Sequence, residues 1–329
     1  MTPIEENFTV RVVSEMRAGK KGGTIAIQMD NVSKSFGDYQ AVRNLSLEVH
    51  RGEIIGFLGL NGAGKTTTIK MLLSLLKPSA GSIYMLGSKV DSGNYKLWEK
   101  VGYLEEASYY PELTVEENLH IARRMQRISD HAAVDRVIRK LDLEAHRNKK
   151  AKNLSLGNKQ RLGLAKAMIH HPEILILDEP INGLDPASVV EIREMLLDLS
   201  RQDGVTIFLS SHLLEELSKL VDRVAIMHKG QLVQNMKMDE LERSLHKKLV
   251  IGGRDMNAMR HVLAKHGYTF ADTAEGQLEL TENRALDHPE RLAELLVREG
   301  HPPTHLGVVT ENLESYFLRT IRTAGRVHE

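Results

Sequence analysis

The chain has 329 residues, no cysteine, and 44 basic and 44 acidic side chains whose charges cancel. This length suits about two domains. The lack of cysteine excludes disulfides, thiolate metal sites and cysteine nucleophiles, and the zero net charge gives no overall attraction to nucleic acid or anionic lipid. No apolar run approaches the ~18 residues of a membrane-spanning helix. Any spans would therefore belong to another chain, and we expect this one to be cytoplasmic.

The chain is predicted to divide into three parts. Residues 1–23 contain no apolar segment of the kind found in secretory signals, and we expect them to form a flexible extension. Residues 24–242 read as an α/β domain, and residues 243–329 as an accessory domain.

The α/β domain begins with strands and a glycine-rich loop. Residues 25–27 and 45–49 alternate like half-exposed strands and predict an antiparallel edge. Residues 54–58 form a continuous apolar run, typical of a strand covered on both faces. A helix from Lys65 to about Leu75 follows the loop, and Lys77-Pro78 ends it.

The loop itself fits the phosphate-binding pattern G-x-x-x-x-G-K-[ST]. Its glycines let backbone N–H groups approach phosphate oxygens, Lys65 would span the β- and γ-phosphates, and the Thr66 hydroxyl would bind Mg²⁺. A glycine turn without nucleotide is the alternative, which the strand before and the helix after disfavour. The sequence therefore predicts ATP and Mg²⁺ at Gly59, Asn61, Gly62, Ala63, Gly64, Lys65, Thr66 and Thr67.

Two later buried strands end in polar residues. Residues 174–177 lead into Asp178 and Glu179, and residues 205–209 lead into Ser210, Ser211 and His212. Asp178 suits Mg²⁺ through water, and Glu179 suits the base that polarises the attacking water. His212 could hold the γ-phosphate, the water and Glu179 in line, although a lone histidine at a strand end is more often a surface residue.

Two further regions have their own patterns. Residues 115–171 are helical with little strand signal and read as an inserted helical subdomain. After residue 243 the predicted order is strand 249–251, helix 255–265, strands 268–270 and 277–280, helix 289–298 and strand 305–309. This β-α-β-β-α-β order is ferredoxin-like α+β. A final amphipathic helix is expected over residues 311–323.

The order of motifs resembles that of the ABC ATPases, over residues 24–235. The resemblance rests on Leu154-Ser155-Leu156-Gly157-Asn158 as signature, together with Asn61 to Thr67, Leu177 to Pro180, Asn182 to Pro186 and Ser210 to His212. It implies a P-loop NTPase fold with a mixed sheet, the antiparallel edge and the helical subdomain.

This resemblance also assigns roles that the residues alone do not. It implies that Phe36 stacks on adenine, and that Ser155 and Gly157 bind the γ-phosphate held by an opposite protomer, with Asp185 coupling the two sites. Two ATP molecules would then lie inside a homodimer, or a pair with a homologous cassette. Hydrolysis would let the pair open.

Three residues depart from the common family pattern. Leu156 and Asn158 stand where Gly and Gln are usual, and Glu106 replaces a glutamine expected to contact Mg²⁺. Glu106 would still offer an oxygen, with added negative charge near the metal. Hydrolysis is expected to persist.

These departures and the short accessory domain resemble ABC-2 type drug, antibiotic or bacteriocin exporters, including bacitracin-resistance-like members. This resemblance implies a separately encoded membrane permease, and a place at the cytoplasmic face of the membrane. Adjacent Tyr109 and Tyr110 suit a groove for a permease helix, and ordinary packing is an equal alternative.

Two other readings remain open at this stage. A soluble ABC ATPase acting on ribosomes or DNA would normally carry two cassettes or long coiled coils, and neither is seen. The zero net charge of the chain also gives no overall electrostatic attraction to the phosphates of a nucleic acid. In another reading, the accessory domain senses a ligand or mediates dimerisation.

Overall fold

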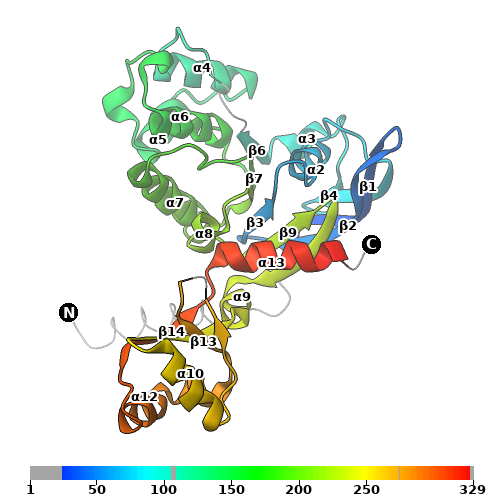
Figure 1. Cartoon of the computed structure of the whole chain (residues 1–329). Coiled ribbons are helices and arrows are strands. Elements are labelled where there is room, and N and C mark those ends of the chain that lie inside the picture. The colour runs from blue at the N-terminus through cyan, green and yellow to red at the C-terminus, as the bar shows by residue number, and fades with distance from the viewer. Residues whose placement is uncertain (1–23, 105–108, 274, 327–329) are drawn as a thin grey trace, which may run out of the picture. The chain divides into compact units, whose positions relative to one another are not determined.

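A computed structural model describes residues 24–104, 109–273 and 275–326 (Figure 1). The predicted extension at residues 1–23 lies outside this range. Two compact units divide the chain: residues 1–212 with 216–235, and residues 213–215 with 236–329. The division falls seven residues before the predicted boundary, so helix α9 (Met238–Ser244) belongs to the second unit.

An antiparallel sheet forms one layer of the first unit. Its strands are β1 (Ile25–Phe36), β2 (Tyr39–His50), β4 (Ala80–Met85) and β5 (Ser88–Lys89), in the order β2-β1-β4-β5. Inward residues such as Ile27, Leu47 and Val49 are buried, as the alternation predicts. The antiparallel edge predicted from the alternation is therefore present, as a four-stranded sheet of its own.

A six-stranded sheet in the order β10-β9-β3-β8-β7-β6 carries the site. Its bounds are β3 (Ile54–Gly59), β6 (Val101–Leu104), β7 (Ile174–Leu177), β8 (Thr206–Ser211), β9 (Arg223–His228) and β10 (Gln231–Lys237). The strands from β9 to β6 pair in parallel. Strands β3, β7 and β8 are buried throughout, as expected for strands covered on both faces. Their carboxyl ends therefore meet at one edge.

Helices flank this sheet (Figure 1). They are α2 (Lys65–Leu72), α3 (Tyr95–Trp98), α7 (Pro186–Arg201) and α8 (Leu214–Ser218). Helix α2 ends three residues before the predicted Leu75. Ser74 takes a φ of 56° there, and the N–H groups of Leu75 and Leu76 both turn back to the carbonyl of Lys70.

The helical subdomain contains α4 (Val115–Met125), α5 (Ala132–Lys140) and α6 (Leu156–Met168), within the predicted range of 115–171. These helices lie together in Figure 1. Two 3₁₀ turns, η1 (Glu144–His146) and η2 (Ala151–Asn153), join α5 to α6. Thr114 and Glu117 form a capping box that begins α4.

The second unit folds as β11 (Lys247–Gly253), α10 (Met256–Lys265), β12 (Ala271–Asp272), β13 (Leu278–Leu280), α11 (Asn283–Asp287), α12 (Pro289–Arg298), β14 (Pro303–Thr310) and α13 (Leu313–Arg326). The sheet order β12-β13-β11-β14, with antiparallel neighbours, is the ferredoxin-like order. A strand over residues 268–270 was wrongly predicted. Arg284 stacks on the Tyr268 ring, and the Glu282 carboxylate accepts the Thr269 N–H, so strand pairing starts at Ala271.

Within the described residues, no helix combines the length and the apolar character that a membrane span requires.

Candidate functional site

The glycine-rich loop joins β3 to α2, where the free N–H groups and dipole of a helix start favour an anion. Gly64 has a φ of 107°, and a Cβ at this position would lie 2.6 Å from the carbonyl oxygen of Ala41. Only glycine can take this conformation so close to another backbone. The loop is thereby fixed against strand β2, with its amides at the helix start.

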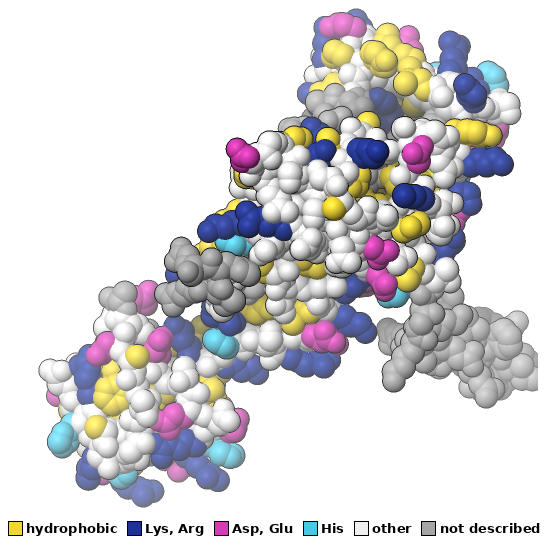
Figure 2. Space-filling view, turned by 90° about the vertical axis from the view of Figure 1, so that its right-hand side faces the viewer, with side chains coloured by type: hydrophobic (Ala, Val, Ile, Leu, Met, Phe, Trp, Pro, Cys, Tyr) yellow, Lys and Arg dark blue, Asp and Glu magenta, His cyan; other side chains and the backbone are white. Residues whose placement is uncertain are grey.

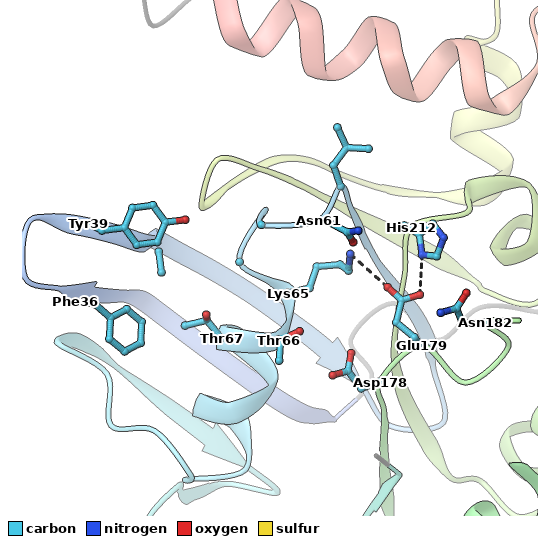
Figure 3. Close-up of a pocket in the computed structure, with 14 residues that line it drawn as sticks. Phe36, Tyr39, Asn61, Lys65, Thr66, Thr67, Asp178, Glu179, Asn182 and His212 are labelled. Carbon is cyan, nitrogen blue, oxygen red and sulfur yellow. Dashed lines mark hydrogen bonds and ion pairs between the residues drawn. The ribbon is translucent and has the colours of Figure 1, made fainter. Parts of the chain in front are cut away.

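Lys65 is buried, and its ammonium group lies at the centre of the site (Figure 3). Its Nζ donates to the Gly59 carbonyl over 2.6 Å and lies 3.4 Å from Glu179 Oε1. The other carboxylate oxygen of Glu179 accepts from His212 Nδ1 over 2.9 Å. The start of α2 and the ends of β7 and β8 thus bring a cation, a carboxylate and an imidazole into contact.

Ser210 fixes the two acidic side chains from strand β8. Its hydroxyl donates to Asp178 Oδ1 over 2.6 Å and accepts the N–H of Glu179 over 3.0 Å. Glu179 has a φ of 50°, a left-handed conformation that is costly for this residue type. Such strain persists where the surroundings impose it, most often at functional sites.

Aromatic side chains stand at the other end of the cleft (Figure 3). Phe36 and Tyr39 are register partners across the hairpin of β1 and β2, so their side chains share a face. Both are exposed, at 50% and 61%. The Lys34 ammonium lies 5.2 Å from the Phe36 ring centroid.

Together these groups line one open cleft of about 510 Å³. Of the predicted residues, the cleft brings together Phe36, Asn61, Gly62, Gly64, Lys65, Thr66, Thr67, Asp178, Glu179 and His212. Gly59 and Ala63 do not line it, because the Gly59 carbonyl holds Lys65 and the Ala63 side chain is buried.

Sequence reasoning missed four residues that also line the cleft: Tyr39, Ala41, Leu60 and Asn182. Leu60 lies inside the phosphate loop and Asn182 just after the acidic strand end. Tyr39 had one signal in the sequence, since the two residues Gly37 and Asp38 between it and Phe36 suit a tight hairpin turn.

The structure describes two of the three predicted magnesium ligands, Thr66 and Asp178. Thr66 and Asp178 line the cleft beside the phosphate loop. Hydroxyl and carboxylate oxygens are the donors that Mg²⁺ prefers, with phosphates and water completing its shell. The residues present therefore fit the ion. Glu106, the third predicted ligand, lies outside the described residues.

The signature residues stand apart from this cleft. Ser155 begins α6 and Asp185 begins α7, each as the N-cap. A Cβ at Gly157 would lie 2.5 Å from Ser188 Oγ, so the two helix starts are in close contact. The Ser188 hydroxyl and N–H donate to Asp185 and hold the pKa of its carboxyl below the usual value. None of Ser155, Gly157 and Asp185 lines the cleft.

A phosphate loop between a buried strand and a helix, facing an acidic strand end, defines a P-loop nucleoside triphosphatase. Residues 42–182 match the family model described as ABC transporter. The chain belongs to the family of ABC transporter ATP-binding proteins, and it is the ATPase subunit of a transporter.

Two similar relatives are bacitracin transport ATP-binding proteins named BcrA. The one from Bacillus licheniformis is 36% identical over 90% of this chain and 97% of its own length. The one from Enterococcus faecalis is 36% identical over 91% of this chain and 97% of its own length. The predicted resemblance to bacitracin-resistance-like members is confirmed.

Solved structures share the fold. The cbiO1 protein from Clostridium perfringens, part of the transporter complex cbiONQ, has a TM-score of 0.62 at 24% identity, over 74% of this chain and 96% of that one. The dimeric bacterial cassette MJ0796 has a TM-score of 0.58 at 25% identity, and the match covers 64% of this chain and 98% of that one. Each match covers nearly the whole of the solved cassette, which confirms the P-loop fold of this chain.

Proposed function

We propose that this chain hydrolyses ATP at the described cleft and thereby powers export through a separate membrane subunit. The observation that carries the proposal is the line from Lys65 through Glu179 to His212, beside the phosphate loop. Lys65 holds the β- and γ-phosphates, and Glu179 accepts a proton from the attacking water. His212 keeps the carboxylate oriented.

Mg²⁺ would be held by the Thr66 hydroxyl and the Asp178 carboxylate, and when bound it neutralises phosphate charge. The Ser210 hydroxyl orients Asp178 for this task. Because the backbone N–H of Glu179 donates to the same hydroxyl, the two carboxylates keep separate positions. Glu106 remains a proposed additional contact.

The working form is proposed to be a head-to-tail dimer, either of two copies or with a homologous cassette. Ser155 and Gly157 lie at the start of α6 and outside their own chain's cleft. They are thus placed to bind the γ-phosphate held by another protomer. The similar cassette MJ0796, which is dimeric, supports a dimer as the working form.

The exported substrate is proposed to be a drug, antibiotic, peptide or lipid, from the similarity to proteins named for bacitracin transport. The chain would act at the cytoplasmic face, bound to its permease. The reading as a ribosome or DNA factor is not favoured, since these relatives are transport proteins. In Figure 2, acidic side chains are present among the basic ones on the face in view. The 44 basic and 44 acidic side chains of the chain cancel, so it has no overall attraction for nucleic acid.

The aromatic pair at the cleft mouth gives a first test. Tyr39→Ala and Phe36→Ala should each weaken ATP binding by roughly 1 to 3 kcal/mol, the usual contribution of a stacked base. Tyr39→Phe, which keeps the ring, should bind like the parent. Calorimetric titration with ATP and with inorganic tripolyphosphate checks this, since a base contact affects ATP alone. Equal losses for both ligands would contradict it.

The permease is proposed to dock beside Tyr110. Residues of α4, α6 and strand β6, among them Met125 and Lys166, line an open groove of about 360 Å³. Lys166 also lies 5.9 Å from the Tyr110 ring centroid, which places this exposed ring next to the groove. The ammonium group of Lys159, which lies on α6 like Lys166, is 5.9 Å from the centroid of the Tyr109 ring.

Replacing both tyrosines, in Tyr109→Ala with Tyr110→Ala, should reduce recovery of the membrane subunit about tenfold or more, as expected for interface aromatics. Co-purification from solubilised membranes measures this recovery. Tyr95→Ala, at an exposed tyrosine on α3, is the matched control. Unchanged recovery with the double variant would mean that the tyrosines only pack the helical subdomain.

A further inference from the structure

The hydroxyl of Ser155 accepts two hydrogen bonds from one residue. The backbone N–H of Asn158 donates to Ser155 Oγ over 3.3 Å, and the side-chain amide of Asn158 donates to the same atom over 3.0 Å. A serine hydroxyl has two lone pairs and one hydrogen. With both lone pairs engaged, its remaining capacity is to donate.

The side-chain amide nitrogen of Asn158 lies within hydrogen-bond distance of both Ser155 and His146. The second amide hydrogen of Asn158 points to His146 Nε2, over 3.1 Å. The amide donates to Nε2 in the tautomer that carries the imidazole proton on Nδ1. That Nδ1 is buried and has no partner among the described residues, an arrangement that costs stability.

The turn that carries His146 is held by ionic contacts. Arg147 follows η1 and pairs with Glu116 of α4, Asp135 of α5 and Glu144 of η1, over 2.8, 2.7 and 3.2 Å. The hydrogen bonds that Arg147 donates to Asp135 and Glu144 raise its pKa above the usual value. Because three elements converge on this guanidinium, the imidazole has little freedom to move away from Asn158.

Losing the acceptor at His146 would free the amide to turn. Asn158 could then present Oδ1 to Ser155, and the serine hydroxyl would donate inward to that oxygen. The hydroxyl hydrogen would no longer be available to an anion in front of the α6 start. Ser155 is exposed, so such an anion can reach it.

We propose that His146, acting through Asn158, is a positioning residue that keeps the Ser155 hydroxyl as a donor to the γ-phosphate of ATP bound by the opposite protomer. This inference rests on the proposed head-to-tail dimer. It also gives a role to Asn158, which departs from the usual signature residue. The amide donates to both Ser155 and His146.

The test uses the full chain with Glu179→Gln, in which slowed hydrolysis should retain ATP and let the proposed closed dimer accumulate. Sedimentation with saturating ATP gives the dimer dissociation constant, and titration at low protein concentration gives ATP affinity of the monomer. His146→Ala and Asn158→Asp should each weaken dimerisation about tenfold, the effect of one hydrogen bond to a charged group. Monomer affinity should stay within about twofold.

Two variants separate positioning from general damage. His146→Gln places an amide oxygen near the position that Nε2 occupies in the parent. This variant should restore dimerisation to within about twofold of the parent. His131→Ala, at an exposed histidine of the same subdomain, should have no effect. If His146→Ala weakened monomer ATP binding as much as dimerisation, the role would be structural and the inference wrong.

The remaining outcomes distinguish this inference from the function on which it rests. Variants that dimerise like the parent would overturn the role of His146 and leave the dimer intact. A parent that binds ATP and stays monomeric, both alone and with its permease, would overturn the dimer and this inference with it.

Discussion

Glu179→Gln should lower the rate of ATP hydrolysis about 10²- to 10⁴-fold, the usual contribution of a general base. The amide has nearly the same shape as the carboxylate and cannot accept the proton of the attacking water. It would also lose the ionic contact with Lys65 over 3.4 Å. ATP binding should persist, because the phosphate loop is untouched. Phosphate release by the purified, permease-bound complex measures the effect.

The matched control is Glu173→Gln. Glu173 directly precedes strand β7, at the end opposite Glu179, and pairs with Arg51 and Lys100 on the surface. Its loss should change the rate less than twofold. If Glu179→Gln hydrolysed ATP as fast as Glu173→Gln, Glu179 would not be the base.

Lys65→Met should weaken ATP binding by about 1.5 to 3 kcal/mol, the range for hydrogen bonds to charged groups, or roughly 10- to 100-fold in dissociation constant. The ammonium is buried and already aimed into the cleft by the Gly59 carbonyl. Methionine fills the same space without charge. Calorimetric titration of the full chain with ATP and Mg²⁺ measures the change.

Lys70→Met provides the comparison, since Lys70 lies on the same helix and is exposed. Its affinity for ATP should equal that of the parent. Equal losses in the two variants would point to a general electrostatic effect of α2, and would remove Lys65 from the phosphate site.

The parts predicted well from sequence are those set by local patterns. A continuous apolar run such as residues 54–58 predicts a buried strand whatever its tertiary partners are. The phosphate loop follows this run directly, so the strand, the loop and the next helix could all be predicted from one stretch of sequence. The same holds for Asp178 and Glu179, since the carboxyl ends of parallel strands meet at one edge of a sheet.

The parts that were missed depend on tertiary partners. Tyr39 joins the cleft through its register with Phe36, and the bond from Asn158 to His146 joins residues on different elements. In the second unit, the side chains of Glu282 and Arg284 decide where strand pairing begins after Tyr268. The two-residue turn before Tyr39 is a signal that the sequence offers for the first of these contacts, whereas the spacing of residues in a single sequence reveals neither of the others.

The central claim is that this ATPase works as the motor of a membrane transporter. Its most direct test is affinity purification of the chain from detergent-solubilised membranes of its native host, with identification and quantification of the proteins that accompany it. We predict a multispan membrane protein in stoichiometric amount, with ATP hydrolysis that Glu179→Gln abolishes. Recovery only from the soluble fraction, together with ribosomes or nucleic acid and without a membrane partner, would contradict the claim.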